Sequence, residues 1–350
     1  MFDAKRFPDT FLDYIPDPPM GRGTYRRALE WSYEHDEANV HPIYALLKVT
    51  NRCSSKCAYC GHAGIIDKKG EASTDVLKDV LDQLADVGAV SVNFTGGEPL
   101  QRSDLPDLVR YARRRGLFPI LLTNGLHLRK RNAELRQAGV GMVIVSVDSV
   151  RPEAYHSIRG VSLTQVLDGI EGLLAWRKAQ RPIISVTAVV TSENLGQLDE
   201  VVTYFGERRI GVEFSPYHHH GRWEDDHLTP RDSAAYSAAM NLLVGMKTAD
   251  RGVINSNAYL DNFVPFSRKK RALPSGYRCY GGYTTIYIDP MLNVRSCWSQ
   301  GLPVAGNLRE HRLQELLDGA RMSVIRKKIR KLKCERCWLL CTAEISLRFQ

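Results

Sequence analysis

The stretch TNRCSSKCAYCGHAG, Thr50–Gly64, places Cys53, Cys57 and Cys60 in a single loop. It follows the apolar run YALLKV at 44–49, which predicts a buried strand. Three thiolates from one loop can hold three irons of a [4Fe–4S] cluster and leave the fourth iron open to an outside ligand. The odd number of cysteines therefore favours an iron–sulfur cluster.

Zinc is the alternative metal for this loop. A structural zinc site normally takes four protein ligands, and His62 is the nearby candidate for the fourth. A disulfide is disfavoured because eight cysteines in clustered spacings, in a chain without a signal-like N-terminus, indicate a reducing compartment. We expect a cytoplasmic protein whose cysteines bind metal.

Composition is that of an ordinary globular protein. The chain has 350 residues, of which 43% are hydrophobic and 25% charged, and no apolar run approaches the roughly 18 residues of a membrane span. The net charge of +9 has two interpretations: the protein binds a phosphate or carboxylate partner, or the basic residues simply form a solvated surface. The basic runs RYARRRG and RKKIRKLK lack interleaved aromatic residues, so we do not expect nucleic-acid binding.

Apolar runs rich in Val and Ile alternate with helical patterns along the first two thirds of the chain. Such runs are typical of parallel strands that helices cover on both faces. The helix near 74–84 has Ser73 or Thr74 as its cap. The expected strands are 44–49, 90–94, 118–122, 142–147, 183–190 and 211–216, and further helices are expected near 103–115, 128–138, 163–178 and 195–206. The pattern predicts an α/β fold, a partial (β/α)6 TIM barrel, with ligands gathered at the carboxyl ends of the strands.

The alternation of predicted strands and helices divides the chain into three segments. Residues 1–43 form an N-terminal extension with one helix near 22–36, and 44–250 form the barrel core. Beyond about residue 250 the alternation stops. We expect a small C-terminal α+β domain at 251–350, with two short strands within 284–298.

The cysteine loop and its surroundings resemble the radical S-adenosylmethionine (SAM) superfamily. The resemblance consists of the Cys-x3-Cys-x2-Cys spacing with Tyr59 before the last cysteine, and of FTGGEPL at 94–100 after the second predicted strand. It implies that Glu98 accepts a hydrogen bond from the SAM ammonium and that two glycines allow close approach of the bound methionine. The matching motif residues are Gly96, Gly97, Glu98 and Pro99.

Further residues match the family in chain order. The resemblance implies that Ser146 and Asp148 lie near the SAM ribose, and that Arg159 contacts the SAM carboxylate or the substrate. It places the region around Thr187 and Val189 near the adenine. The matching positions are Asn124 in LLTNG, Ser146, Asp148 and Arg159 in the fourth-strand pattern, and Thr187, Val189 and Asn194 in VTAVVTSEN.

The activity implied by the resemblance is reductive cleavage of SAM to methionine and a 5′-deoxyadenosyl radical, which abstracts hydrogen from the substrate. An electron donor such as flavodoxin or ferredoxin is the implied protein partner. The protein would position the target carbon and exclude water.

The other five cysteines lie in the C-terminal segment, which resembles the SPASM and twitch auxiliary-cluster domains. Five thiols are too few for two fully ligated clusters, so the resemblance implies one auxiliary [4Fe–4S] cluster. Leu292 stands where the family usually has glycine. Cys341 is then a cluster ligand, a free thiol or a hydrogen-atom donor, and a zinc site is the alternative for the set. These cysteines are Cys279, Cys297, Cys334, Cys337 and Cys341.

Substrate contacts are expected at the end of the sixth strand, from Glu213, Tyr217 and Arg222. Consecutive histidines cannot all face one ion on a regular element, so metal binding by 218–220 is disfavoured. We predict an enzyme acting on a small polar metabolite, a nucleoside or sugar derivative in antibiotic or other natural-product biosynthesis. Oxidation, epimerisation, decarboxylation and sulfur insertion all stay open. The alternatives are a maturase of a ribosomally made peptide and a non-catalytic zinc scaffold.

Overall fold

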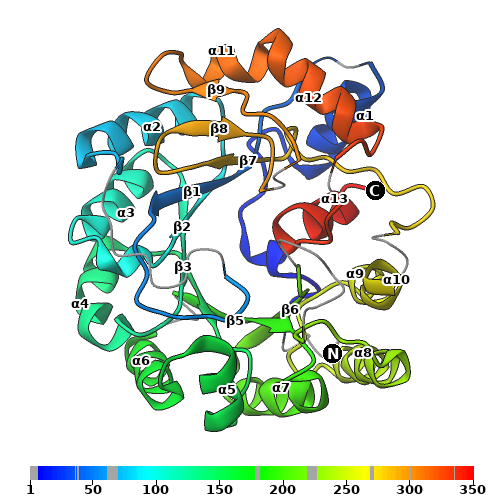
Figure 1. The fold of residues 1–350 in the computed structure, drawn as a ribbon. Helices are drawn as coiled ribbons and strands as arrows, with labels where there is room; N and C mark the ends of the chain where they lie inside the picture. The colour runs from blue at the N-terminus through cyan, green and yellow to red at the C-terminus, as the bar shows by residue number, and fades with distance from the viewer. Residues whose placement is uncertain are drawn as a thin grey trace, which may run out of the picture.

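A single nine-stranded sheet organises the described part of the chain (Figure 1). The computed structural model describes residues 7–35, 37, 39–60, 70–177, 182–218, 227–268, 272–298, 301–334 and 336–350. The strand order is β6-β5-β4-β3-β2-β1-β7-β8-β9. The strands are β1 Tyr44–Thr50, β2 Ser91–Gly96, β3 Phe118–Thr123, β4 Met142–Ser146, β5 Ile183–Val190, β6 Gly211–Pro216, β7 Thr285–Ile288, β8 Asn293–Arg295 and β9 Gly306–Asn307.

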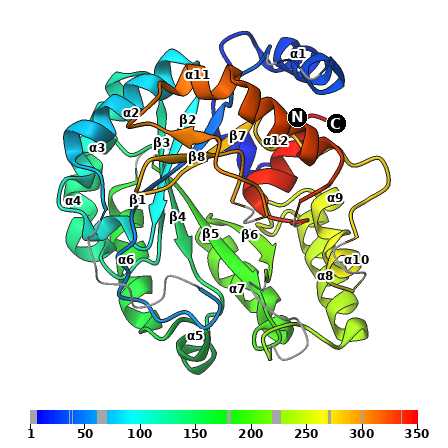
Figure 2. The same ribbon diagram turned by 45° about the horizontal axis from the view of Figure 1, so that its top comes forward.

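Strands β1 to β6 are parallel and are joined by helices that cover the outer face of the sheet (Figures 1 and 2). Ser73 caps α2 as expected, its side chain accepting a hydrogen bond from the Val76 backbone N–H at 3.4 Å. The helices of the barrel are α2 Thr74–Asp86, α3 Leu105–Arg114, α4 Leu128–Ala138, α5 Pro152–Arg159, α6 Leu163–Trp176 and α7 Leu198–Glu207, with short 3-10 turns η2 Pro99–Gln101 and η3 Leu195–Gln197.

Alternation along each strand sends side chains to two separate cores. Outward residues such as Leu47, Phe94 and Val145 pack under the helices. Inward residues such as Leu46 and Ile144 face the barrel interior, where they join residues from both ends of the chain. The sheet does not close, so the predicted partial (β/α)6 TIM barrel with a C-terminal domain is confirmed.

The remaining helices lie at the two ends of the chain and after β6. Among the described residues no helix combines the length and apolar character needed to cross a membrane. These elements are η1 Phe11–Tyr14, α1 Arg22–His35, α8 Ser233–Thr248, α9 Asn257–Leu260, α10 Phe263–Arg268, α11 Leu313–Asp318, α12 Ala320–Arg330, the π-helical turn η5 Leu340–Glu344 and α13 Ile345–Arg348.

The C-terminal segment continues the barrel sheet rather than forming a separate one. Strand β7 pairs in parallel with β1, in the register Tyr44 to Thr285 and Leu47 to Ile288. Strands β8 and β9 then add antiparallel pairs. The two short strands predicted within 284–298 are therefore present, and their edge places the C-terminal cysteines beside the barrel.

The open side of the barrel faces the end of the chain. Figure 1 shows α13 lying between β7 and α9. Trp338 is fully buried there and stacks on Tyr259, with ring centroids 5.5 Å apart. The Trp338 indole N–H donates to the Tyr259 carbonyl at 2.9 Å, and the Tyr259 hydroxyl donates to the Trp338 carbonyl at 2.7 Å. This reciprocal pair joins the end of the chain to α9, one of the helices that follow β6.

Removing this pair should loosen that joint. We expect Trp338→Ala to lower the free energy of unfolding by about 3–5 kcal/mol, because it deletes a fully buried aromatic side chain. Trp338→Phe keeps the stacked ring and loses the indole hydrogen bond, so a loss of about 1 kcal/mol is expected. Urea denaturation under anaerobic conditions measures both. Equal losses in the two variants would contradict the account.

Candidate functional site

The cysteine loop is fastened to the end of α5. The Lys56 N–H donates to the Arg159 carbonyl at 3.2 Å, and the Ala58 N–H donates to the Ile158 carbonyl at 2.9 Å. Cys53 and Cys57 are buried and Cys60 is exposed. The loop therefore has a fixed backbone path with two thiols turned inward and one reachable from outside.

The two glycines at the end of β2, Gly96 and Gly97, interlock with the same loop. The Gly97 N–H donates to the Thr50 carbonyl at 2.8 Å, and the Glu98 N–H donates to the Arg52 carbonyl at 2.6 Å. A Cβ on Gly96 would lie 2.3 Å from the Thr50 carbonyl oxygen, and one on Gly97 would lie 2.2 Å from that of Arg52. Gly96 also has φ +148°. Close approach of the cysteine-loop backbone thus already requires both glycines.

Glu98 is fully buried, and its carboxylate is held by the protein. Oε1 accepts from the Leu100 N–H at 3.0 Å and the Thr123 hydroxyl at 2.7 Å, and Oε2 accepts from the Asn124 N–H at 2.7 Å. Burial raises the pKa of Glu98 to about 7, and these three donors oppose the rise. A carboxylate has about four acceptor sites, so one stays available on Oε2 for a further donor.

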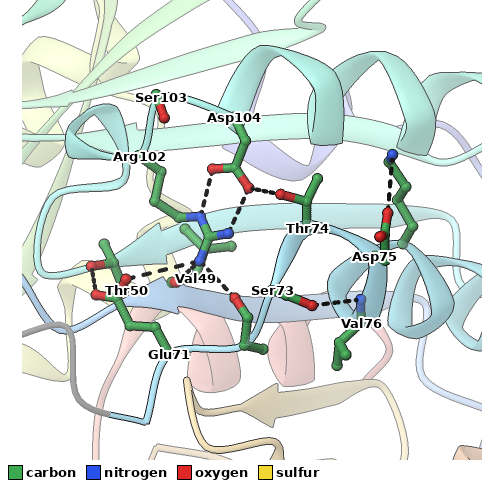
Figure 3. A network of polar contacts seen from close by, with 12 residues as sticks. Val49, Thr50, Glu71, Ser73, Thr74, Asp75, Val76, Arg102, Ser103 and Asp104 are labelled. Atoms are coloured by element: carbon green, nitrogen blue, oxygen red, sulfur yellow. Dashed lines mark hydrogen bonds and ion pairs between the residues drawn. The ribbon is translucent and has the colours of Figure 1, made fainter.

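A polar network that the sequence did not reveal supports the loop from behind (Figure 3). The Arg102 guanidinium donates to the Val49 and Ala72 carbonyls, both at 3.0 Å, and to both oxygens of Asp104. Glu71 accepts from the Thr50 hydroxyl and, at 3.3 Å, from Arg52. Arg102 comes three residues after the GGEP motif, and only the fold shows that it joins the chain before and after the loop.

Asp148 and Arg159 form a buried ion pair beside the second cysteine. Arg159 donates to Asp148 through Nε at 2.6 Å and through Nη2 at 3.2 Å. Asp148 also accepts from the Tyr59 hydroxyl and the Val189 N–H, both at 2.8 Å. The Arg159 Nη1 atom lies 3.9 Å from the Cys57 sulfur. Burial raises the pKa of Cys57 to about 11, and Arg159 opposes that rise.

These contacts bear on the roles expected for Asp148 and Arg159. Both carboxylate oxygens of Asp148 already have protein donors, and its side chain is 0% exposed. The pair therefore ties the cysteine loop to β4 and β5. Contact with SAM from either residue stays a prediction.

The other predicted SAM-site residues gather around the same loop. The Asn124 amide donates to the Ser55 hydroxyl at 2.8 Å and lies 3.8 Å from the Cys53 sulfur. Asn194 donates to the carbonyls of Asp148 and Val189, both at 2.8 Å. Ser146 and Thr187 are paired in register on β4 and β5. Pro99 begins η2, directly behind the interlocked turn.

The predicted substrate residues lie at different depths. Tyr217 is 7% exposed and contacts the ring of Tyr59, with centroids 6.4 Å apart. Glu213 is 3% exposed; burial and the neighbouring Glu344 raise its pKa to about 8. Glu344, which the sequence analysis did not single out, is also buried, and its Oε2 has no hydrogen-bond partner among the described residues. Arg222 lies outside the described residues, as do His219, His220 and His62.

The five C-terminal thiols come together on one side of the barrel. Cys279 and Cys297 both adjoin Gly281, where a Cβ would lie 3.6 Å from the Cys279 sulfur and 3.8 Å from the Cys297 Cβ. Burial raises the pKa of Cys279 to about 12, and the charges of Cys297 and Cys334 add to the rise. Burial and the charge of Cys297 raise the pKa values of Cys337 and Cys341 in the same way. His218 accepts a hydrogen bond from the Trp338 N–H at 3.2 Å, next to Cys337.

Both cysteine sets fit iron–sulfur clusters. Buried, mutually repelling thiols ionise when a metal centre neutralises them. A [4Fe–4S] cluster takes one thiolate per iron, and each of the two sets offers at least three thiols. The donor chemistry therefore suits clusters.

Comparison with known families gives two matches. The radical SAM superfamily matches residues 47–205, and SPASM, an iron–sulfur cluster-binding domain, matches residues 279–338. The second match includes four of the five C-terminal cysteines and ends before Cys341.

Curated relatives include peptide and nucleotide cyclases. A PqqA peptide cyclase of Bradyrhizobium diazoefficiens is 34% identical over 46% of this chain and 42% of its own length. A GTP 3′,8-cyclase of Limosilactobacillus fermentum is 31% identical over 49% of this chain and 53% of its own. A PqqA peptide cyclase of Methylocella silvestris is 26% identical over 79% of this chain and 74% of its own. The chain spans about half the length of the first two relatives.

Solved structures share the fold. SuiB of Streptococcus suis bound to S-adenosylmethionine aligns with a TM-score of 0.67 and 18% identity, over 90% of this chain and 75% of its own. At that identity the likeness concerns the fold alone.

The expectation of a nucleoside or sugar-like substrate is wrong. The relatives that match most of this chain are named for a peptide substrate. The error has a physical origin, since cysteine spacing and net charge report on cofactors and surface, not on what the pocket binds.

The interlock at Gly97 makes a first prediction for this site. We expect Gly97→Ala to displace the cysteine loop, because its Cβ would meet the Arg52 carbonyl at 2.2 Å. After anaerobic reconstitution the variant should lack the iron of the barrel cluster and keep that of the C-terminal set. Gly245→Ala is the matched control, since a Cβ there meets nothing within 4 Å. Full iron content in Gly97→Ala would refute the interlock.

The buried ion pair makes a second prediction. Asp148→Asn leaves the Arg159 charge uncompensated in a buried place and should lower the free energy of unfolding by about 3–5 kcal/mol. Glu200→Gln breaks the exposed pair with Arg151 and should leave stability unchanged. Chemical denaturation of both variants measures the difference. A small, equal effect in the two would show that the Asp148 pair is not structural.

Proposed function

Because this chain is a radical SAM protein with a C-terminal SPASM domain, we propose that it is an enzyme that modifies a peptide. Its cofactors are S-adenosylmethionine, a [4Fe–4S] cluster in the barrel and an auxiliary iron–sulfur cluster in the SPASM domain. The observation that carries the peptide substrate is the extent of similarity. A PqqA peptide cyclase matches 79% of this chain, whereas the match to a GTP 3′,8-cyclase covers 49%.

The residues proposed to hold the barrel cluster are Cys53, Cys57 and Cys60. Bound there, the cluster and SAM supply a radical able to remove a hydrogen atom from an unactivated carbon. The protein's part is to fix the three thiols through the loop contacts to Gly97 and Glu98, and to place Arg159 beside Cys57.

The proposed SAM site lies on the inner side of the same loop. Glu98 has one acceptor position left for an ammonium group, and Asn124 lies between the loop and β3. Ser146, Thr187 and Val189 line the neighbouring strand ends. Tyr217 contacts Tyr59 on this side of the loop, with ring centroids 6.4 Å apart.

Five C-terminal cysteines are proposed for the auxiliary cluster and its surroundings. Cys279, Cys297, Cys334 and Cys337 lie within the SPASM match, and we propose them as ligands. Cys341 lies just outside it, near Glu213 and Cys297. It is proposed as a ligand or as a hydrogen-atom donor to the substrate radical.

The test uses a short peptide encoded beside the gene. Reconstituted enzyme is incubated anaerobically with SAM, a flavodoxin-type reductant and this peptide, and mass spectrometry follows the peptide and 5′-deoxyadenosine. We expect peptide-dependent 5′-deoxyadenosine and a changed peptide mass. Cys57→Ala should abolish both, and exposed Lys331→Ala, the control, should abolish neither. An unchanged peptide with every neighbouring precursor would contradict the proposal.

A further inference from the structure

A cavity lies between the first strand and the C-terminal hairpin, beside the cysteine loop. It has a volume of about 400 Å³, which is within the range of small-ligand pockets. Lys48 and Asn51 line it from β1 and the start of the loop. Tyr287, Asp289, Arg295 and Trp298 line it from β7, β8 and the residues that follow. The parallel pairing of β7 with β1 creates this space.

The cavity carries two cations from different elements. Lys48 is 2% exposed, and burial lowers its pKa to about 8, while nearby Cys60 and Asp289 oppose the shift. Arg295 is half-buried, and its Nη1 donates a 3.5 Å hydrogen bond to the Leu302 carbonyl. A buried ammonium and a guanidinium that line one space favour an anionic guest.

Among the described residues that line the cavity, Asp289 is the one acidic group, and the hairpin turn already uses it. Asp289 Oδ1 accepts from the backbone N–H groups of Met291 and Asn293, at 2.9 and 3.0 Å. Its Oδ2 accepts from the Asn293 side-chain amide at 2.9 Å. Asp289 thus shapes the turn, and the described lining contributes two cations beside this one carboxylate.

An aromatic wall stands next to the cations. Tyr287 and Trp298 meet edge to face, with ring centroids 4.9 Å apart and planes at 72°. The Lys48 ammonium lies 5.9 Å from the centre of the Trp298 ring. A guest whose carboxylate reaches the cations therefore has a flat apolar surface beside it for stacking.

We propose that this cavity binds a carboxylate of the peptide substrate through Lys48 and Arg295, with an adjacent flat group stacked against Trp298. The carboxylate belongs to an acidic side chain or to the peptide's C-terminus. The inference rests on the proposed function because it takes the guest to be a peptide. Since Asn51, at the start of the cysteine loop, also lines the cavity, the bound residue lies beside that loop.

The test measures binding without turnover. Reconstituted enzyme with SAM and no reductant is titrated with N-acetyl-Phe-Glu-amide, N-acetyl-Phe-Gln-amide and N-acetyl-Phe-Gln with a free C-terminus. Saturation-transfer NMR gives the dissociation constants. We expect either carboxylate probe to bind at least about tenfold tighter than the uncharged probe, as one charge-assisted hydrogen bond implies. The carboxylate probe with the higher affinity shows whether the bound carboxylate is that of an acidic side chain or that of the peptide's C-terminus.

Variants connect that preference to the cavity. Lys48→Met and Arg295→Gln should each reduce the preference to near unity and leave SAM affinity unchanged. Arg295 is half-buried, so its variant keeps the test valid if Lys48→Met does not fold. Exposed Arg309→Gln is the control and should keep the full preference.

Three results would overturn the inference. The first is equal binding of charged and uncharged probes to the wild type. The second is a preference that both variants retain. The third is a tenfold loss of SAM affinity in both, which would assign the cations to the cofactor. Failure of the proposed function looks different: no peptide changes mass under turnover, although the carboxylate preference persists.

Discussion

The backbone interlock between the turn after β2 and the loop after β1 is the contact on which the site depends. The carbonyls of Thr50 and Arg52 accept hydrogen bonds from the N–H groups of Gly97 and Glu98. Neither Gly96 nor Gly97 has room for a Cβ. The turn fixes the first part of the cysteine loop, and α5 fixes its later part. Three thiols on a flexible loop would lose conformational entropy on binding a cluster, and a loop fixed in advance has already lost most of it.

The buried charged groups Asp148, Glu98 and Arg102 around this interlock have hydrogen-bond partners in the protein. Asp148 accepts hydrogen bonds from Arg159, Tyr59 and a backbone N–H. Glu98 accepts from three donors, and the Arg102 guanidinium joins strand, loop and turn. Burial of such groups is costly unless hydrogen bonds compensate it, so each one also specifies a single geometry. On the substrate side, Glu344 keeps an oxygen without a hydrogen-bond partner among the described residues, and Lys48 is buried beside a cavity.

Local patterns in the sequence predicted the strands, the α2 cap and the cysteine loop, because each depends on neighbours in the chain. Pairing of β7 with β1 was not predictable, since TIYI carries no mark of its partner strand. Arg102 and Glu344 were missed because their importance arises from burial against distant segments. The substrate class was mistaken because the motifs describe cofactor binding, whereas a cavity such as the one lined from β1, β7 and β8 is assembled only by the fold.

The central claim is that the three loop cysteines hold one cluster and leave one of its irons open to SAM. Mössbauer spectroscopy of the anaerobically reconstituted protein, with and without SAM, tests it most directly. The account predicts that SAM changes the signal of a single iron site of the barrel cluster and leaves the C-terminal cluster unaffected. Identical spectra with and without SAM, or zinc in place of iron in the loop, would contradict it.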